Sequence, residues 1–336
     1  MSPLLQPPRF WYRPAGWQAR LLAPVAEVYG RRVVARMRQP GQRAAVPVVC
    51  IGNFTLGGAG KTPLALAVAD LLAEAGYKPA FLTRGYGGSE TGPLRVMPGA
   101  VAAEVGDEAL LLARKAPTIV SVDRPAGAAL AVSDGATIIV MDDGFQNPSL
   151  EKDCSIIAVD GETGIGNGMT FPAGPLRAPL HDQMPFVSAV VVIGPGDAGG
   201  RVLDFARGSG LAALQARIVL DPSAPVLRGK RVLAFAGIGR PEKFFKTLAD
   251  MGAIIAATQV FPDHHPFTEN DAMAIASRAQ SGRLIPVTTT KDMVRLTGGP
   301  ARTGLASITR SVPVRLVFEE ENSMREFLHR HFRIRK

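Results

Sequence analysis

Short runs of consecutive apolar residues recur along the chain between residues 47 and 194, separated by stretches with helical spacing. A run that is apolar at every position, rather than at every second one, is typical of a strand covered on both faces of a parallel sheet. Connections in such sheets are short and right-handed, and ligands bind at the carboxyl ends of the strands. The pattern therefore predicts a doubly wound, mostly parallel α/β sheet with strands at 47–52, 79–83, 118–122, 137–141, 155–160 and 189–194.

A second, smaller α/β unit is predicted from residue 228 onward. A strand with a glycine turn at 231–239 runs into Pro241, which opens a helix that Gly252 stops. Further strands are expected at 253–260 and 284–290, with a helix between them at 269–280. We expect four segments in all: a basic segment over 1–40, a large α/β domain over 41–227, a small one over 228–313, and a closing segment over 314–336 whose helix packs back on the large domain.

The N-terminal segment has an amphipathic pattern over residues 15–38. Trp17, Leu21, Val25 and Val28 follow helical spacing, and arginines supply positive charge around them. An aromatic and aliphatic face beside arginines suits the surface of an anionic bilayer. A helix packed on the protein with a solvated basic face is the alternative, and both remain open at this stage.

Net charge then narrows the choice of partner. The chain carries a formal charge of +9 with a pI near 9.9, which favours an anionic partner: a nucleotide, a phospholipid surface, nucleic acid or an acidic substrate. No nucleic-acid-binding motif accompanies the charge, so we expect no nucleic-acid partner. Two cysteines exclude a disulfide framework and favour a reducing compartment, and no secretory signal or spanning run is visible.

The most informative segment is IGNFTLGGAGKTP at 51–63, where an expected strand meets a glycine-rich turn and an expected helix. Glycines in such a turn let backbone N–H groups surround phosphates, and the helix dipole favours the same anion. Lys61 is placed to reach the β- and γ-phosphates and Thr62 to ligate Mg²⁺. The segment predicts a P-loop NTPase-like fold that binds nucleotide through Thr55, Leu56, Gly57, Gly58, Ala59, Gly60, Lys61 and Thr62.

A second acidic element follows the apolar strand expected at 137–141. Asp142 and Asp143 stand at its carboxyl end, where P-loop enzymes hold Mg²⁺. Alone, Asp-Asp-Gly reads more often as a turn, but the phosphate loop makes the metal interpretation the favoured one. Asp142, the first residue after the strand, is the better candidate. ATP and Mg²⁺ are the expected cofactors.

The ensemble of motifs then resembles one family, tetraacyldisaccharide 4'-kinase of the lipid A pathway. The motifs are, in order, GNFTLGGAGKTP, LTRGYGG, VGDEALLLA, DDGFQN, FPAGPLR and FPDHHPF. The resemblance covers nearly the whole chain. It implies transfer of the γ-phosphate of ATP to the 4'-hydroxyl of a tetraacyldisaccharide 1-phosphate, giving lipid IV-A. It also implies a peripheral enzyme at the cytoplasmic face of the bacterial inner membrane.

The resemblance assigns two acid–base residues. Asp107, in VGDE, matches the carboxylate that the family uses as general base on the sugar hydroxyl, although the residues alone favour a helix N-cap. His264 matches the histidine that pairs with this base, and His265 is its neighbouring rival. Since His264 belongs to the small domain, a meeting of the two side chains would place the active site between the domains.

Other contacts with the acceptor or with phosphate are expected from the same motifs. Arg177 in FPAGPLR matches a family arginine; many members follow it with Glu, where this chain has Ala178. Asp182 lies too far along to be assumed as a replacement. Weaker candidates for such contacts, with loop structure as their alternative, are Arg84, Tyr86 and Asn147.

Two other classes of protein compete with a lipid kinase. One is a membrane-docked P-loop nucleotide switch, but TTTKD at 288–292 lacks the intervening residue of a guanine-reading motif. The other is an ATP-dependent ligase or small-molecule kinase on the same scaffold, because a fold does not dictate a reaction. The arginine-rich N-terminal helix favours an acceptor that lives in the membrane. We expect the protein to act as a monomer.

Overall fold

The computed structural model describes residues 7–332 and contains two separate sheets. The strands of the larger sheet are β1 (Val48–Asn53), β2 (Pro79–Thr83), β3 (Leu94–Arg95), β4 (Thr118–Val120), β5 (Ile138–Asp142), β6 (Cys154–Asp160), β7 (Ala189–Ile193), β8 (Ala212–Leu220) and β13 (Val314–Phe318). Their order is β13-β8-β7-β6-β1-β5-β2-β4-β3. All neighbours run parallel except the two edge pairs, β13 with β8 and β3 with β4. The predicted mostly parallel sheet is confirmed.

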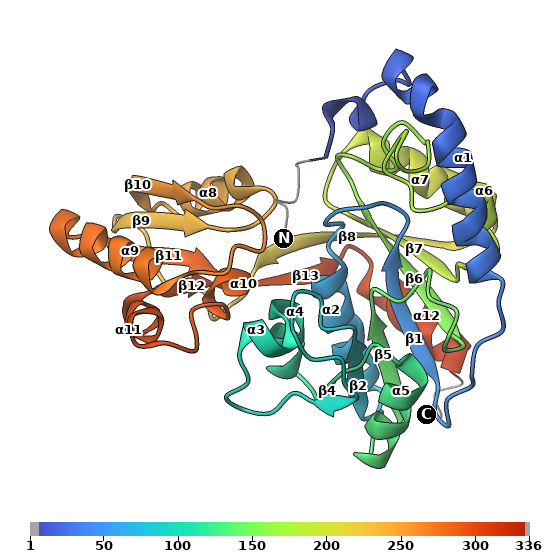
Figure 1. Cartoon of the computed structure of the whole chain (residues 1–336), viewed down its shortest axis with the longest axis horizontal. Helices are drawn as coiled ribbons and strands as arrows, with labels where there is room; N and C mark the ends of the chain where they lie inside the picture. Colours follow the sequence, from blue (N-terminus) through green and yellow to red (C-terminus); the bar gives the residue numbers. More distant parts are fainter. Residues whose placement is uncertain (1–6, 333–336) are drawn as a thin grey trace.

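Helices cover both faces of this sheet, as its continuously buried strands require (Figure 1). One face packs against α2 (Lys61–Glu74), α4 (Asp107–Ala113) and α12 (Glu321–Phe332). The other packs against α1 (Trp17–Met37), α5 (Arg124–Ser133) and α7 (Asp197–Gly208). Shorter helices are α3 (Ala102–Val105), α6 (Leu180–Gln183) and the 3-10 turns Arg9–Tyr12 and Met184–Phe186.

The smaller sheet has the order β10-β9-β11-β12, with all strands parallel. Its elements are β9 (Arg231–Ala236), α8 (Pro241–Asp250), β10 (Ile254–Val260), α9 (Glu269–Gly282), β11 (Ile285–Thr289), α10 (Thr290–Met293), α11 (Pro300–Ile308) and β12 (Arg310–Val312). Alternate residues of β9 enter two cores, one under α8 and one under α9 and α11. This unit therefore carries hydrophobic cores of its own.

The small unit is joined to the large sheet by two connections that lie side by side. The chain leaves the large sheet along β8 and returns along β13, and Leu220 pairs with Val314 at the point of departure. The closing segment therefore contributes a sheet strand as well as the expected helix, and Met324, Phe327 and Leu328 of that helix enter the main core. Arg333, Arg335 and Lys336, which add to the basic C-terminus, lie outside the described residues.

Helix α1 lies along the outer edge of the large unit (Figure 1). One side of it is buried through Ala19, Ala26, Gly30, Val34 and Met37. A Cβ at Gly30 would come within 3.0 Å of Pro179 Cδ, so glycine permits the close approach of the helix. No helix among residues 7–332 is both long enough and apolar enough to cross a membrane.

Candidate active site

The loop between β1 and α2 forms a cradle of unpaired backbone donors. Gly57 and Gly60 adopt positive φ angles of 104° and 81°, which glycine allows without strain. Asn53 braces the loop by donating its side-chain amide to the carbonyls of Thr55 (2.6 Å) and Gly57 (3.2 Å). Within the described chain, the N–H groups from residue 57 to residue 62 have no protein acceptor. Such a row of donors at a helix N-terminus suits a phosphate chain.

The first half of the loop is held by the segment that contains Arg177. The N–H of Leu56 donates to the carbonyl of Pro175 at 2.8 Å, and the N–H of Arg177 donates to Phe54 at 2.8 Å. Arg177 Nε also donates to the carbonyl of Thr55 at 3.2 Å. Of the predicted nucleotide-binding residues, Leu56 therefore has its N–H engaged by protein. The row of available donors starts one residue later.

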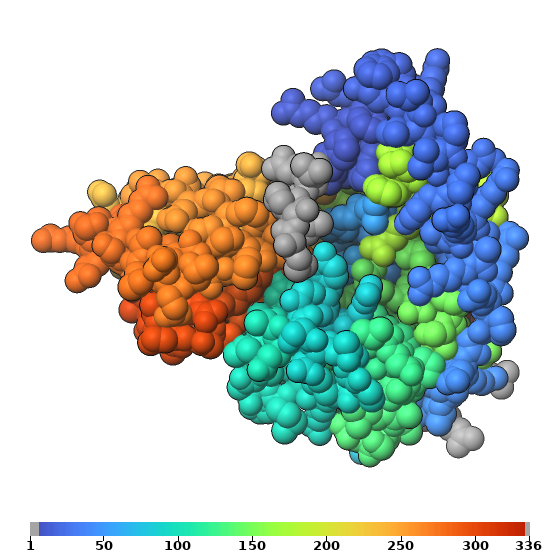
Figure 2. All heavy atoms as spheres, viewed as in Figure 1, coloured from blue at the N-terminus to red at the C-terminus, as the bar shows by residue number. Residues whose placement is uncertain are grey.

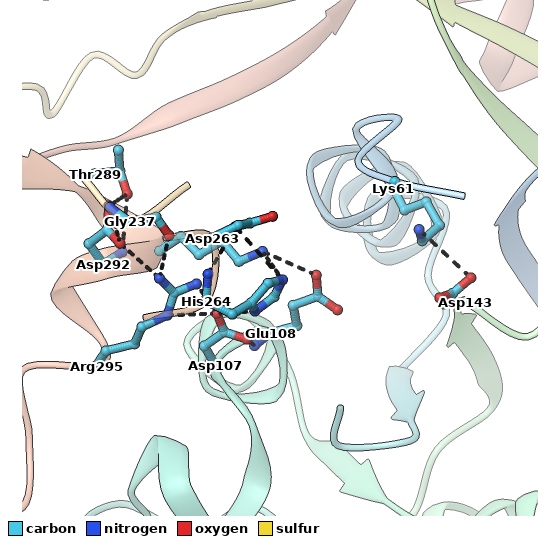
Figure 3. A network of polar contacts seen from close by, with 12 residues as sticks. Lys61, Asp107, Glu108, Asp143, Gly237, Asp263, His264, Thr289, Asp292 and Arg295 are labelled. Carbon is cyan, nitrogen blue, oxygen red and sulfur yellow. Dashed lines mark hydrogen bonds and ion pairs between the residues drawn. The ribbon is translucent and has the colours of Figure 1, made fainter. Parts of the chain in front are cut away.

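The two adjacent carboxylates after β5 have opposite environments. Asp142 is 1% exposed and neither of its oxygens has a hydrogen-bond partner within the described chain. Burial, reinforced by the charge of Glu108, raises the pKa of Asp142 to about 8. Asp143 contacts Lys61 Nζ (3.7 Å) and Arg177 Nη1 (3.3 Å), as Figure 3 shows for the lysine. Burial alone would raise the pKa of Asp143, but these two cations lower it overall.

These features fit a Mg²⁺ ion that accompanies a nucleotide. Asp142 ends the strand next to β1, the strand that leads into the phosphate loop, and it is the register partner of Ile51. A buried carboxylate without partners is costly unless something cationic neutralises it. Mg²⁺ in phosphate-transfer sites is held by one or two carboxylates together with phosphates and water. Thr62, second residue of α2, and Asp142 are the residues placed to hold it.

The predicted acid–base pair does meet, and it does so across the two units. Asp107 is the first residue of α4 and is 5% exposed. His264 Nδ1, from the small unit, lies 3.1 Å from Asp107 Oδ2 (Figure 3). Gly106 occupies the N-cap position instead, so Asp107 is not the cap that the residues alone favour. The surfaces of the small unit and the α3–α4 region adjoin each other in Figure 2.

The neighbouring histidine turns away from this pair. His265 Nε2 lies 3.0 Å from Asp271 Oδ2, and its ring stacks on Phe261 with 4.7 Å between centroids. His265 is therefore a structural residue of the small unit. His264 is presented by a left-handed backbone, with φ at 58°, and its N–H donates to the carbonyl of Gly237 at 3.1 Å.

Several charged residues around Asp107 were missed in the sequence. Lys291 Nζ lies 3.2 Å from His264 Nε2 and 3.5 Å from Glu108 Oε1, and Arg295 donates to Asp107 Oδ2. Burial alone would raise the pKa of Asp107, but the hydrogen bond from His264 and the charges of Lys291 and Arg295 hold it well below its usual range. Lys291 lies in TTTKD, directly after strand β11 (Ile285–Thr289), and this position at the carboxyl end of a strand is a local signal that could have identified it. Arg295 follows α10 and has no such signal.

The weaker candidates divide into two groups. Tyr86 lies edge-on to His264, with 5.7 Å between ring centroids, and Arg84 is exposed just after β2. Asn147 Oδ1 accepts the N–H of Ser149 at 2.9 Å, so this side chain stabilises its own loop, the alternative to a substrate contact. Arg124, which was not predicted from the sequence, is 2% exposed at the start of α5. Burial lowers the pKa of Arg124, and the nearby negative charges of Asp142 and Asp143 act in the opposite direction.

The position after Arg177 carries no carboxylate, and Asp182 does not supply one in its place. Ala178 is fully buried, and its carbonyl accepts the side-chain amide of Gln183 at 2.7 Å. Asp182 instead pairs with Arg38 at 2.9 Å and His181 at 3.0 Å. It is therefore committed to the region of α1 and does not replace a carboxylate at 178.

Strand, glycine-rich loop, helix and the carboxylates on the adjacent strand define the P-loop class of phosphate-binding proteins. The family described as tetraacyldisaccharide-1-P 4'-kinase (LpxK) matches residues 18–333 of the sequence. The chain belongs to that family.

Relatives and a solved structure agree with this membership. A protein named tetraacyldisaccharide 4'-kinase from Methylobacterium sp. (strain 4-46) is 55% identical over 95% of both chains. Another of that name, from Methylobacterium radiotolerans, is 54% identical over 96% of this chain and 97% of its own. The crystal structure of LpxK from Aquifex aeolicus in complex with ATP superimposes with a TM-score of 0.73 at 25% identity, covering 94% of this chain and 99% of that one.

Proposed function

We propose that this protein transfers the γ-phosphate of ATP to the 4'-hydroxyl of a tetraacyldisaccharide 1-phosphate. Membership of the family and the similarity to an ATP-bound LpxK support the reaction. The observation that carries the proposal is the 3.1 Å contact of Asp107 with His264, because each residue comes from a different unit. A nucleotide switch needs no acid–base pair of this kind.

In this proposal the loop residues bind and orient the nucleotide. The N–H groups from 57 to 62 surround the phosphates, and Lys61, whose Nζ lies 3.7 Å from Asp143 Oδ1, reaches the β- and γ-phosphates. Arg177, close to the same loop, supplies further positive charge at the γ-phosphate. Asp142 and Thr62 would hold Mg²⁺, which would neutralise charge that develops on the phosphates.

The acceptor side of the reaction belongs to Asp107. As the 4'-oxygen forms its bond to the γ-phosphorus, the bond from phosphorus to the β–γ bridging oxygen breaks and ADP leaves. The hydroxyl proton passes to Asp107 Oδ1, the oxygen that faces away from His264. A strongly basic carboxylate is not required, since the transition state is loose and the proton leaves late. His264 orients the carboxylate through Oδ2.

The experiment is a transfer assay with labelled ATP, Mg²⁺ and an acylated disaccharide 1-phosphate. We expect a bis-phosphorylated product from the unaltered protein, and a fall of at least about 1,000-fold in Lys61→Ala because the phosphates lose their cation. Lys115→Ala is the matched control, since that lysine pairs with Asp70 on the surface. The proposal would be refuted by ATP hydrolysis at a rate that does not depend on the lipid and yields no phosphorylated lipid, or by normal transfer in Lys61→Ala.

We also propose that the protein lies peripherally at the cytoplasmic face of the bacterial inner membrane and works as a monomer. The support for the membrane is α1, whose apolar side chains Trp17 (72% exposed) and Leu21 (71% exposed) face outward beside arginines. An acceptor with four acyl chains is itself confined to a membrane, so a surface helix of this kind brings the kinase to its substrate.

A further inference from the structure

A charge cluster is buried where the small unit meets α4. Asp107 is 5% exposed, Asp292 is fully buried and Arg295 is 6% exposed. One carboxylate comes from the large unit, whereas the arginine and the second carboxylate come from the small one. Buried charges are retained in proteins when they are paired and fully hydrogen-bonded, so the contacts of the arginine are informative.

The small unit holds the guanidinium of Arg295 rigidly. Its Nη1 donates to Asp292 Oδ1 and to the carbonyl of Gly237, each at 2.8 Å. Asp292 is fixed in turn, because it accepts the N–H of Gly237 at 3.1 Å and the hydroxyl of Thr289 at 2.7 Å. The other edge of the guanidinium group, formed by Nε and Nη2, is thereby directed at the large unit.

That edge meets a single oxygen of Asp107. Arg295 Nε donates to Asp107 Oδ2 at 2.8 Å, and Nη2 donates to the same atom (Figure 3). His264 Nδ1 reaches Oδ2 as well, while among residues 7–332 Oδ1 accepts only the N–H of Glu108, at 2.9 Å. Gly237 accepts bonds from both His264 and Arg295, so the two donors arrive as one assembly. Oδ1 keeps a lone pair for another donor.

We propose that Arg295 is a positioning residue, which docks with Asp107 Oδ2 when the small unit closes and so presents Oδ1 to the acceptor hydroxyl. The inference rests on the proposed role of Asp107 as base. It makes the base competent only while the small unit is docked. Arg295 acts through Asp107 and does not touch the substrate.

The charge of Arg295 has a second effect on the base. Burial favours the protonated form of a carboxyl group, as at Asp142, whose pKa is raised. At Asp107 the hydrogen bond from His264 and the charges of Lys291 and Arg295 outweigh burial and lower the pKa. The charged groups around Asp107 are Arg295, Lys291 and His264 on the positive side, with Glu108 and Asp292 on the negative side. Loss of Arg295 therefore raises the pKa of Asp107 and leaves less of the base ionised at a given pH.

The test compares Arg295→Met and Arg295→Lys with the unaltered full chain in the transfer assay. For Arg295→Met we expect kcat to fall about 100-fold, which is the size of effect expected when the general base Asp107 is no longer positioned. The KM for ATP should change by less than about threefold. The acidic limb of the kcat–pH profile should move upward by about one pH unit or more. Arg295→Lys keeps the positive charge, so its acidic limb should return to the pH of the unaltered protein and its kcat should partly recover.

A matched control variant and a double-mutant cycle distinguish a positioning role of Arg295 from a general effect on folding. Arg302→Met removes an arginine that pairs with Glu269 inside the small unit at 2.8 Å, and it should leave the pH profile unchanged. In an Asp107→Asn background, Arg295→Met should cost little further rate, because both changes act on one group. If Arg295→Met does not fold, Arg295→Gln, which keeps a donor toward Asp292 without the charge, replaces it.

Three results would overturn the inference. They are a full-rate Arg295→Met, a rate loss with an unmoved acidic limb, and a loss in Arg295→Met that is undiminished in the Asp107→Asn background. Failure of the underlying proposal has a different signature: Asp107→Asn would then transfer phosphate at a near-normal rate, whatever Arg295 does.

Discussion

At the scale of single residues, identical side chains acquire opposite properties from their neighbours. Asp142 and Asp143 are adjacent in sequence, yet the first is buried without a partner and the second contacts two cations. The reason is the strand end: Asp142 completes β5 inside the sheet, and Asp143 turns out of it with φ at 53°. The free carboxylate, rather than the paired one, is the position ready for a metal ion.

This difference predicts how two variants respond to Mg²⁺. Because the pKa of Asp142 is raised to about 8, the folded protein must take up a proton at neutral pH to keep this partnerless carboxyl group buried. Asp142→Asn removes that requirement, so without metal or nucleotide we expect the melting temperature to rise by about 2 °C or more. The same variant should lose the extra stabilisation by Mg²⁺ with ATP and about 100-fold or more in kcat. Thermal melting with and without Mg²⁺–ATP, together with the transfer assay, measures both effects.

Asp143→Asn is the control for that experiment. It breaks the contacts with Lys61 and Arg177, so the metal-free melting temperature should not increase. A less stable Asp142→Asn that still responds to Mg²⁺–ATP would show that Asp142 does not hold the ion.

The sequence identified residues that stand beside a strong local signal. The strand–loop–helix pattern located Lys61, and the family motifs located Asp107 and His264, which the structure places 3.1 Å apart. Arg295 escaped because its partner lies 188 positions away, and nothing local distinguishes it from a surface arginine. Long-range ion pairs of this kind follow from the docking of two units, which periodicity does not describe.

At the scale of elements, α1 combines a packed face with an exposed apolar one. Gly30, Val34 and Met37 lie against the large unit, whereas Trp17, Leu21 and Val25 point away from it. The packed interpretation is confirmed for the buried side of this helix, and the membrane interpretation now concerns its exposed side, where it stays a prediction. Removing residues 1–38 would uncover the core at Met37, so it is a poor test of membrane binding.

Substitutions on the exposed face test the membrane role directly. Trp17→Ser, Leu21→Ser and Val25→Ser combined should weaken binding to anionic phospholipid vesicles by about tenfold or more, because apolar area that would enter the bilayer is lost. The fold should be unaffected, since all three side chains are more than half exposed. Co-sedimentation with vesicles is the measurement.

Equally exposed apolar residues on the small unit supply the control. Val226→Ser and Met273→Ser alter side chains that are 87% and 53% exposed and lie far from α1 in the sequence. They should leave sedimentation unchanged. If the α1 variant sediments as well as the unaltered protein, this face does not bind membranes.

Elements were predicted from sequence where their burial was continuous. β1, β5 and β7 are buried at every position and were found from their apolar runs. β8 and β13 were missed, because both lie toward an edge of the sheet and expose many of their residues. The strand expected at 118–122 ends at Val120, where Ser121 bonds to Thr83 and the chain turns toward α5.

At the scale of the whole molecule, the small unit is an insertion between two paired strands. Its hydrophobic cores draw only on residues 227–312, and none of these belongs to the cores of the large sheet. Its contacts with the large unit include the ion pairs of Arg240 with Asp160 at 2.9 Å and with Glu162 at 3.0 Å. We therefore expect the stability of each unit to be largely independent of the other.

This independence predicts that the small unit is dispensable for nucleotide binding. Replacing residues 221–313 by an Asn-Gly turn joins Leu220 to Val314, which are already partners in the sheet. The shortened protein should fold and be stabilised by ATP, yet show no detectable transfer, because His264 and Arg295 are gone. Thermal melting with ATP and the transfer assay test this prediction.

The point mutant His264→Ala is the comparison for the shortened protein. It should retain some transfer, since Arg295 still holds Asp107 in place. Transfer by the shortened protein at a rate equal to that of the point mutant would mean that docking contributes nothing to the reaction.

The pairing of Leu220 with Val314 also limits how the small unit can travel. Residues 221–230 connect β8 to β9, but Pro313 alone separates β12 from β13, so one of the two connections allows little travel. We therefore expect the small unit to rotate along a restricted path that brings His264 and Arg295 to Asp107 in the same orientation at each closure. Part of the entropy of finding the competent arrangement would then be lost during folding rather than in each turnover.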